Sequence, residues 1–197
     1  MKIAVLVLAA GKSSRMKSPK QLVTIGTNFL IEYILSKAKS IEADEVYCVL
    51  GANSEIILKE ISSPDVLFFK NKDFEKGLSE SLSYGVSEIE KQYQNYDGIL
   101  VLLGDQPTIE KEYLNNMIML FNKNKNKIVA SNYGKKLGVP ALFHKKYFQD
   151  LKNISGDTGA QKILNENLNV ISPIMKTEFL DIDTEKDYQD FKNSILN

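Results

Sequence analysis

The chain has 197 residues, of which 43% are hydrophobic and 25% are charged, a composition typical of a globular domain with a substantial core. Lys and Arg together number 25, as do Asp and Glu, so no overall charge favours nucleic acid or an anionic membrane as a partner. With one cysteine, Cys48, and one histidine, His144, neither an intrachain disulfide nor an ordinary zinc site is expected. We therefore expect a single domain over residues 1–197, located in the reducing cytoplasm, with Cys48 packed in the core.

The first ten residues also match the outline of a secretory signal, with Lys2 followed by an apolar stretch over residues 3–10. That stretch is short for a signal. It is followed at once by four basic residues, Lys12, Arg15, Lys17 and Lys20. Cleavage would also remove an apparent strand of the fold. We expect the segment to be the first strand rather than a cleaved signal.

In chain order, apolar runs and helical spacing first predict a strand over 3–8, a long loop over 9–28, a helix over 30–38 and a strand over 46–50. Next come a short helix over 56–61, a strand over 66–69, a helix over 78–89 and a strand over 99–103. Thr108 is the expected cap of a helix over 113–121, and a short strand follows over 128–130.

Residues 131–146 have an irregular or hairpin-like pattern that could add an antiparallel strand. The chain then continues with helices over 145–152 and 158–166, a strand over 170–175 and a last helix over 185–195. Thr184 and Asp187 fit the capping-box template that would begin this last helix. The alternation predicts an α/β fold of three layers, Rossmann-like, with a mostly parallel sheet and helices on both faces.

The loop after the first strand suits phosphate binding. Its small residues 9–11 let a ligand approach the backbone, whose N–H groups can face phosphate oxygens. Arg15 and Lys20 add positive charge. A Walker loop would need a glycine at Leu6, and a dinucleotide fingerprint needs three glycines where this loop has only Gly11. Both of those motifs are excluded, and a solvated basic loop without a ligand is the alternative reading.

The stretch LAAGKSSRMKSPKQL (residues 8–22) resembles the signature loop of the MobA-like nucleotidyltransferases, with small residues, an Arg-Met pair and a lysine at set offsets. Five later segments resemble the same superfamily in order and spacing: NKDFEKGLSESL (71–82), LLGDQP (102–107), GVPALF (138–143), GDTGAQKIL (156–164) and FLDIDTEKDY (179–188). The likeness covers essentially the whole chain and implies a nucleotidyltransferase fold. Residues 8–11 and 77–82 most resemble the molybdenum cofactor cytidylyltransferases, which favours CTP over GTP.

In such enzymes an acceptor phosphate attacks the α-phosphate of a nucleoside triphosphate, so the protein mainly positions the reactants and neutralises charge. The resemblance implies that Arg15 and Lys20 are the catalytic cations facing the triphosphate and the leaving pyrophosphate. It also implies that Asp105 and Asp183 bind Mg²⁺ together with phosphate oxygens. The nucleotide-binding residues it implies are Leu8, Ala9, Ala10, Gly11, Gly77, Ser79 and Ser81.

Structural roles remain open for several of these residues. Asp105 follows a buried strand and so lies at the carboxyl edge of the sheet, but Asp-x-Pro is also ordinary turn chemistry. Asp183 and Ser79 each precede or begin a predicted helix and could be capping residues. Three positions depart from the family pattern: Lys17 replaces a frequent glycine, Phe74 a frequent tryptophan and Gln161 a frequent arginine. The last change bears on how an anionic acceptor is recognised.

The expected function is Mg²⁺-dependent transfer from CTP to the phosphate of a molybdopterin-type cofactor, with release of pyrophosphate. One alternative is a nucleotidyltransferase acting on a sugar phosphate or another small phosphate, because the fold alone does not separate acceptors. Another is a non-catalytic nucleotide-binding accessory protein that delivers cofactor. The expected partners are CTP and a phosphate-bearing small molecule, with a transient contact to a molybdoenzyme or its chaperone and with neither nucleic acid nor membrane.

Overall fold

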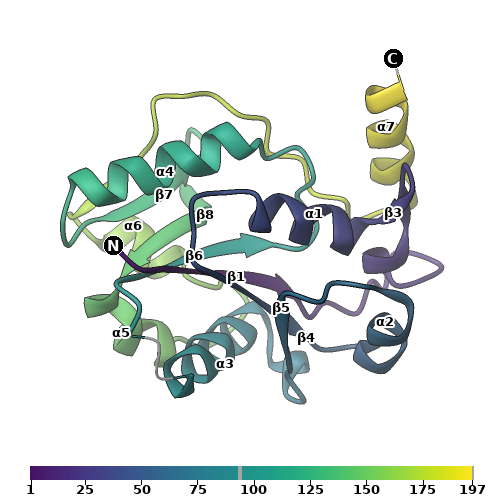
Figure 1. Ribbon diagram of the computed structural model, residues 1–197, viewed down its shortest axis with the longest axis horizontal. Coiled ribbons are helices and arrows are strands. Elements are labelled where there is room, and N and C mark those ends of the chain that lie inside the picture. Colours follow the sequence, from purple (N-terminus) through teal and green to yellow (C-terminus); the bar gives the residue numbers. More distant parts are fainter. Residues whose placement is uncertain (93–94, 197) are drawn as a thin grey trace.

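The computed structural model describes residues 1–92 and 95–196, with a seven-stranded sheet at its centre in the order β5-β4-β1-β6-β8-β7-β9 (Figure 1). Its strands are β1 (Ile3–Ala9), β4 (Glu45–Leu50), β5 (Val66–Lys70), β6 (Gly98–Leu103), β7 (Ile128–Asn132), β8 (Leu137–His144) and β9 (Val170–Ile171). The α-helices are α1 (Leu30–Lys39), α2 (Ser54–Glu60), α3 (Leu78–Lys91), α4 (Lys111–Lys123), α5 (Phe148–Lys152), α6 (Gln161–Glu166) and α7 (Glu185–Leu196).

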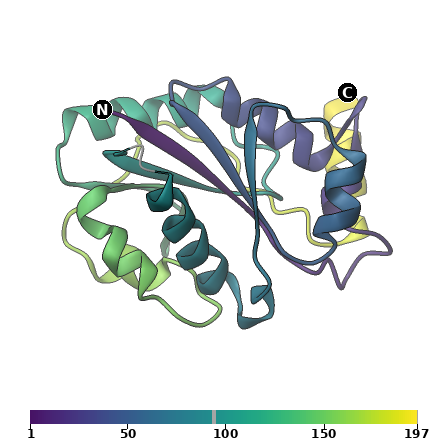
Figure 2. The same cartoon turned by 60° about the horizontal axis from the view of Figure 1, so that its bottom comes forward.

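Strand β1 shows how this sequence builds three layers. All seven of its residues are buried, and they alternate between the two faces of the sheet. Ile3, Val5 and Val7 join one core with α1, α4 and α7, whereas Leu6 and Leu8 join a second core with α3, α5 and α6. Figures 1 and 2 show α1 and α4 on one face and α3 and α5 on the other. The predicted α/β sandwich is therefore confirmed.

The sheet is parallel from β5 through β4 and β1 to β6, and β8 then runs antiparallel to both of its neighbours. The irregular region at 131–146 thus supplies the antiparallel strand that its pattern left open. Strand β9 is shorter than expected and spans only two residues. Cys48 is fully buried in β4, as predicted.

Two further local details differ from the sequence-based prediction. Thr108 does not cap α4, whose N-cap is Glu110 without a side-chain bond. Instead the Thr108 hydroxyl donates to the carbonyl of Glu178 (2.8 Å) and accepts from the N–H of Leu180 (3.2 Å), which fastens the C-terminal segment to the sheet edge. The expected loop over 9–28 contains the 3-10 turn η1 (Lys20–Leu22) and the ribbon of β2 (Thr24–Ile25) and β3 (Asn28–Phe29).

Two further 3-10 turns, η2 (Phe74–Lys76) and η3 (Lys145–Tyr147), lead into α3 and α5. In the part of the chain that the structure describes, no helix combines the length and apolar character needed to cross a membrane.

Candidate active site

The candidate site lies at the carboxyl ends of β1 and β6, which are adjacent parallel strands with Leu8 opposite Leu103. The basic loop leaves β1 at this edge, and Asp105 follows β6 two residues after its end. Because both segments emerge from neighbouring strands on the same side, the loop cations and the carboxylate meet.

Asp183 reaches the same edge through the C-terminal segment. The N–H of Ile182 donates to the carbonyl of Asp105 (2.9 Å), which sets the two aspartates side by side. The predicted capping box is present just after them. Asp187 accepts from the N–H of Thr184 (2.8 Å), while the Thr184 hydroxyl accepts from the N–H of Asp187 (3.2 Å).

A cluster of four charged side chains forms the centre of the site. Lys20 Nζ lies 2.6 Å from Asp105 Oδ2 and 2.8 Å from Asp183 Oδ1. Arg15 Nη2 lies 2.9 Å from Asp183 Oδ2. The side chains of Lys20 and Asp105 are 13% and 18% exposed, so this ion pair is largely shielded from water. The four residues that the sequence singled out for phosphate and metal chemistry are therefore brought together.

The environment shifts the pKa values of Asp105, Asp183 and Lys20. Burial raises the pKa of Asp105, and the adjacent Lys20 charge opposes that rise only in part. Burial also pushes the pKa of Asp183 upward, but the hydrogen bonds and charges of Lys20 and Arg15 together lower it below its usual value. For Lys20, burial acts to lower the pKa, and the two carboxylates outweigh it so that the pKa is raised. Lys20 is thus held between two carboxylates in a place that water reaches poorly.

Whether a divalent cation fits here can be judged from Asp105. Its second oxygen, Oδ1, is buried and has no hydrogen-bond partner, although burying an unpartnered carboxylate oxygen is costly. The described residues contain no group of three or more His, Cys, Asp or Glu side chains arranged for a metal. Asp105 and Asp183 could therefore supply two ligands, with phosphate and water oxygens completing the shell, as Mg²⁺ prefers.

A first cleft, with an empty volume of about 840 Å³ that includes open solvent, runs from the basic loop to the start of α3. Most of the predicted nucleotide-binding residues line it: Leu8, Ala10, Gly11, Gly77 and Ser81. Phe74 and Asp105 also line the cleft. Gly77 is the N-cap of α3 and has a φ of 102°, in the region that favours glycine.

Two predicted nucleotide-binding residues lie away from the lining of this cleft. Ala9 is 5% exposed at the end of β1. Ser79 is fully buried in the first turn of α3, where its hydroxyl donates to the carbonyl of Gly159 (3.4 Å) and its N–H to the carbonyl of Gly156 (3.2 Å). The structure thus gives Ser79 a role in holding the loop after α5 against α3.

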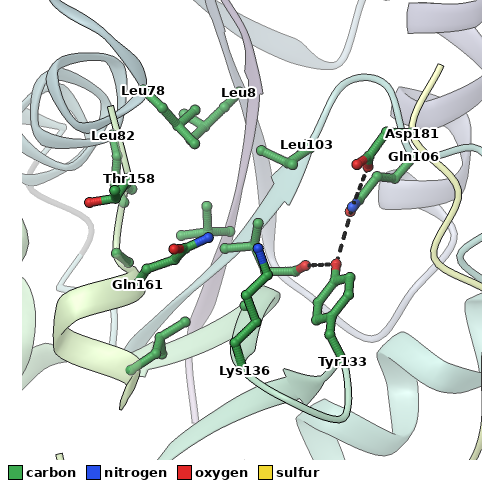
Figure 3. Close-up of a pocket in the computed structure, with 16 residues that line it drawn as sticks. Leu8, Leu78, Leu82, Leu103, Gln106, Tyr133, Lys136, Thr158, Gln161 and Asp181 are labelled. Atoms are coloured by element: carbon green, nitrogen blue, oxygen red, sulfur yellow. Dashed lines mark hydrogen bonds between the residues drawn. The ribbon is translucent and has the colours of Figure 1, made fainter. Parts of the chain in front are cut away.

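A second cavity, of about 640 Å³ of empty volume including open solvent, shares Leu8, Leu78 and Leu103 with the first cleft. Figure 3 shows Thr158 and Gln161 on one side of it and Gln106 with Tyr133 on the other. Aliphatic side chains form much of the wall. Of the charged cluster, Asp105 lines the first cleft, and its sequence neighbour Gln106 lines the second cavity, so two different molecules could be held on either side of this segment.

The second cavity contains a polar network that sequence reasoning missed. Gln106 Nε2 donates to Asp181 Oδ1 (2.8 Å) and to the Tyr133 hydroxyl (3.1 Å), and Tyr133 in turn donates to the carbonyl of Val139 (Figure 3). Burial raises the pKa of Tyr133 to about 12, so its hydroxyl keeps its proton at neutral pH. The segments LLGDQP and FLDIDTEKDY contain Gln106 and Asp181, but no local signal marked Tyr133.

Comparison with known proteins adds a family and several relatives. The family model of the MobA-like NTP transferase domain matches residues 5–170. The bifunctional protein GlmU of Francisella philomiragia is 34% identical over 121 residues, which cover 60% of this chain but only 25% of that protein. The chain thus spans about a quarter of the length of this relative. The purine catabolism protein PucB of Bacillus subtilis is 29% identical over 193 residues, covering 92% of this chain and 91% of PucB.

Among solved structures, Rv0371c of Mycobacterium tuberculosis matches 98% of this chain and 97% of its own, with a TM-score of 0.82 and 24% identity. A second structure of Rv0371c, described as a complex with manganese, has a TM-score of 0.79 and 23% identity, and covers 98% of this chain and 100% of its own. These likenesses show that this chain and Rv0371c share a fold.

Proposed function

This chain belongs to the MobA-like NTP transferase family, and on that premise we propose that it transfers the cytidylyl group of CTP to the phosphate of a molybdopterin-type cofactor. In this reaction an acceptor phosphate oxygen bonds to the α-phosphorus of CTP. The bond from that phosphorus to the β-phosphate bridging oxygen breaks, and pyrophosphate leaves. The acceptor phosphate is already ionised at neutral pH, so the reaction needs no general base.

The observation that carries this proposal is the cluster of Lys20, Arg15, Asp105 and Asp183, whose member Asp105 lines the first cleft. Two anions must approach each other for the transfer, and two cations, the shielded Lys20 and the exposed Arg15, lower the cost of that approach. Arg15 and Lys20 would turn toward the triphosphate oxygens when CTP is bound, which exchanges one set of anionic partners for another.

We propose that the divalent ion is Mg²⁺ and that Asp105 and Asp183 hold it. When bound, the ion withdraws charge from the phosphates and stabilises the leaving pyrophosphate. The buried Asp105 Oδ1 without a hydrogen-bond partner supports Asp105 as a ligand, and the manganese complex of Rv0371c supports a divalent ion in this fold. Lys20 occupies the space between the two carboxylates, so it would have to shift toward the phosphates for Asp105 and Asp183 to hold the ion.

The choice of CTP rests on the Leu-Ala-Ala-Gly stretch at residues 8–11 and on the segment 77–82, both of which line or border the first cleft. For the acceptor, the neighbouring cavity offers a mostly aliphatic wall and a polar edge at Gln106 and Asp181. Such a lining suits a flat ring system better than a sugar, whose hydroxyls each need a polar partner.

The second candidate acceptor is a sugar phosphate or another small phosphate. Gln161, which stands where relatives often carry arginine, lines the cavity and leaves Lys136 as the one cationic residue among its lining residues. That arrangement weakens the case for a strongly anionic acceptor.

The test is pyrophosphate release with CTP and Mg²⁺, measured with molybdopterin-type cofactor and separately with a set of sugar phosphates. Release that depends on the pterin acceptor and disappears in an Asp105→Ala variant supports the proposal. Release only with a sugar phosphate selects the second candidate. Binding of CTP without release for any acceptor would favour an accessory protein that delivers nucleotide or cofactor.

We further propose that residues 1–197 act as one domain and that the protein works in the cytoplasm, in line with a buried, reduced Cys48 and a nucleotide substrate. A product cofactor would then pass to a molybdoenzyme or its chaperone by transient contact.

A further inference from the structure

Gln21 is a buried polar residue that the chemistry of the cluster does not use. It lies in η1, directly after Lys20, and is 1% exposed. A buried amide must satisfy both its donors and its acceptor, so its partners are informative. All of the partners of the Gln21 side chain belong to the basic loop.

The amide nitrogen of Gln21 binds the inner side of the loop. Nε2 donates to the carbonyl of Ala9 (2.9 Å) and to the carbonyl of Gly11 (3.3 Å). Both carbonyl oxygens are thereby paired with the buried amide, next to the cleft that Gly11 lines. In the described part of the chain, the backbone N–H groups of Gly11 and Lys12 have no hydrogen-bond acceptor. Two carbonyl acceptors that would repel a phosphate are therefore already paired, whereas two N–H donors that would attract a phosphate are not.

The amide oxygen of Gln21 holds the far side of the loop through Ser13. The Ser13 hydroxyl donates to Gln21 Oε1 (3.3 Å) and accepts from the backbone N–H of Lys20 (2.9 Å). Ser13 itself has a φ of 55°, a left-handed conformation that non-glycine residues seldom adopt. The two hydrogen bonds of its hydroxyl compensate for that conformation.

The same network also fixes the origin of the Lys20 side chain. Its backbone N–H is bound by Ser13, while its Nζ reaches Asp105 and Asp183. One buried amide thus joins the shape of the loop to the placement of the cation.

We infer that Gln21 is a positioning residue for the triphosphate: it shapes the loop over residues 9–15 and fixes Lys20, without touching the nucleotide. This inference rests on the proposed function, because it takes the loop to be the triphosphate site. Loss of Gln21 should weaken the binding of CTP, which has three phosphates, more than the binding of CMP, which has one.

The test is a calorimetric titration of CTP and of CMP, each with Mg²⁺, on the wild-type protein and on Gln21→Met. Methionine keeps the length and unbranched shape of glutamine but makes neither carbonyl bond nor the bond to Ser13. Losing bonds of ordinary strength to the loop should raise the Kd of CTP at least about tenfold, whereas the Kd of CMP should change less than about threefold. Gln149→Met, on the exposed side of α5, is the matched control and should change neither Kd.

An unchanged ratio of the two Kd values in a folded Gln21→Met variant would overturn the inference, because a residue that merely stabilises the fold would affect both nucleotides alike. Melting temperature and circular dichroism establish that the variant is folded. If it is not folded, the test is repeated on Ser13→Ala, which removes the hydroxyl that bonds to Gln21 and to the Lys20 N–H from a partly exposed position. This variant should show the same selective loss of CTP affinity. A wild-type protein that binds no nucleoside triphosphate at all would instead refute the proposed function, before any variant is made.

Discussion

Replacing Lys20 with methionine should destabilise the metal-free protein through one specific partner, Asp105. Asp183 keeps its ion pair with Arg15 and is 35% exposed, whereas Asp105 is 18% exposed and loses the one charged hydrogen-bond donor that the described residues give it. Removing one member of a buried ion pair typically costs 3–5 kcal/mol, because a charge is left buried without a partner. Since the Lys20–Asp105 pair keeps some contact with water, we expect the lower end of that range, about 3 kcal/mol.

Urea unfolding at pH 7.5 in the presence of a chelator measures this effect as a change in the free energy of unfolding. The double variant Lys20→Met/Asp105→Asn removes the stranded charge and should recover about 2 kcal/mol relative to Lys20→Met. Lys17→Met, an exposed lysine in the same loop, is the control and should change stability by less than about 0.5 kcal/mol. A double-mutant cycle with no coupling energy between Lys20 and Asp105 would refute the reasoning.

The pH dependence of the Lys20→Met variant gives an independent check. Burial already raises the pKa of Asp105, and Lys20 is the main group that opposes the rise, so its removal should raise this pKa further. A carboxyl group whose pKa is higher in the folded than in the unfolded state destabilises the folded protein while it is ionised. This cost disappears as the pH falls and the group becomes protonated. The penalty of Lys20→Met should therefore be largest near pH 8 and shrink as the pH falls toward the ordinary aspartate value of about 4. A penalty that grows on acidification would contradict the assignment.

Three further outcomes are expected. The carboxylate of Asp97, whose pKa is lowered by its bond from Lys145 and from a backbone N–H, should stabilise the fold above pH 4 and stop doing so as the pH falls through its lowered pKa. An Asp97→Asn penalty that grows as the pH falls would contradict this. Cys48, buried with a raised pKa, should resist thiol reagents until the protein unfolds, which a denaturant series of labelling measures. Gly77→Ala should cost about 1–3 kcal/mol in urea unfolding, because its φ is 102° and a Cβ would lie 2.1 Å from Asp157 Oδ1; an unchanged midpoint would show that the turn adapts.

The fold was largely predictable because its first half uses strong local signals. Continuous apolar runs bounded by loops mark β1, β4 and β6, and each is buried on both faces. Strand β8 carried no such signal, since Gly138 and Pro140 interrupt it. The structure accommodates that proline at a register shift between Ala130 and Ser131 of β7. A missing N–H costs little where the ladder is already irregular.

The candidate site was predictable only where its residues belong to sequence motifs. Asp105 and Asp183 were assigned from the family resemblance, and in the structure both form ion pairs with Lys20. The network around Gln106 was not predictable, because its partners lie 27 and 75 residues away along the chain. Gln21 was within the quoted motif but gave no sign of its role, since the direction of a buried amide depends on how the loop folds back.

We propose that the cluster of Lys20, Arg15, Asp105 and Asp183 forms a nucleotidyltransferase centre selective for CTP. The most direct measurement is a calorimetric titration of CTP, GTP, ATP and UTP with Mg²⁺, on the wild-type protein and on Asp105→Ala. We expect CTP to bind most tightly, and we expect Asp105→Ala to bind CTP at least about tenfold more weakly because it lacks a metal ligand. Equal binding of all four nucleotides, or CTP binding that is unchanged in Asp105→Ala, would contradict this proposal.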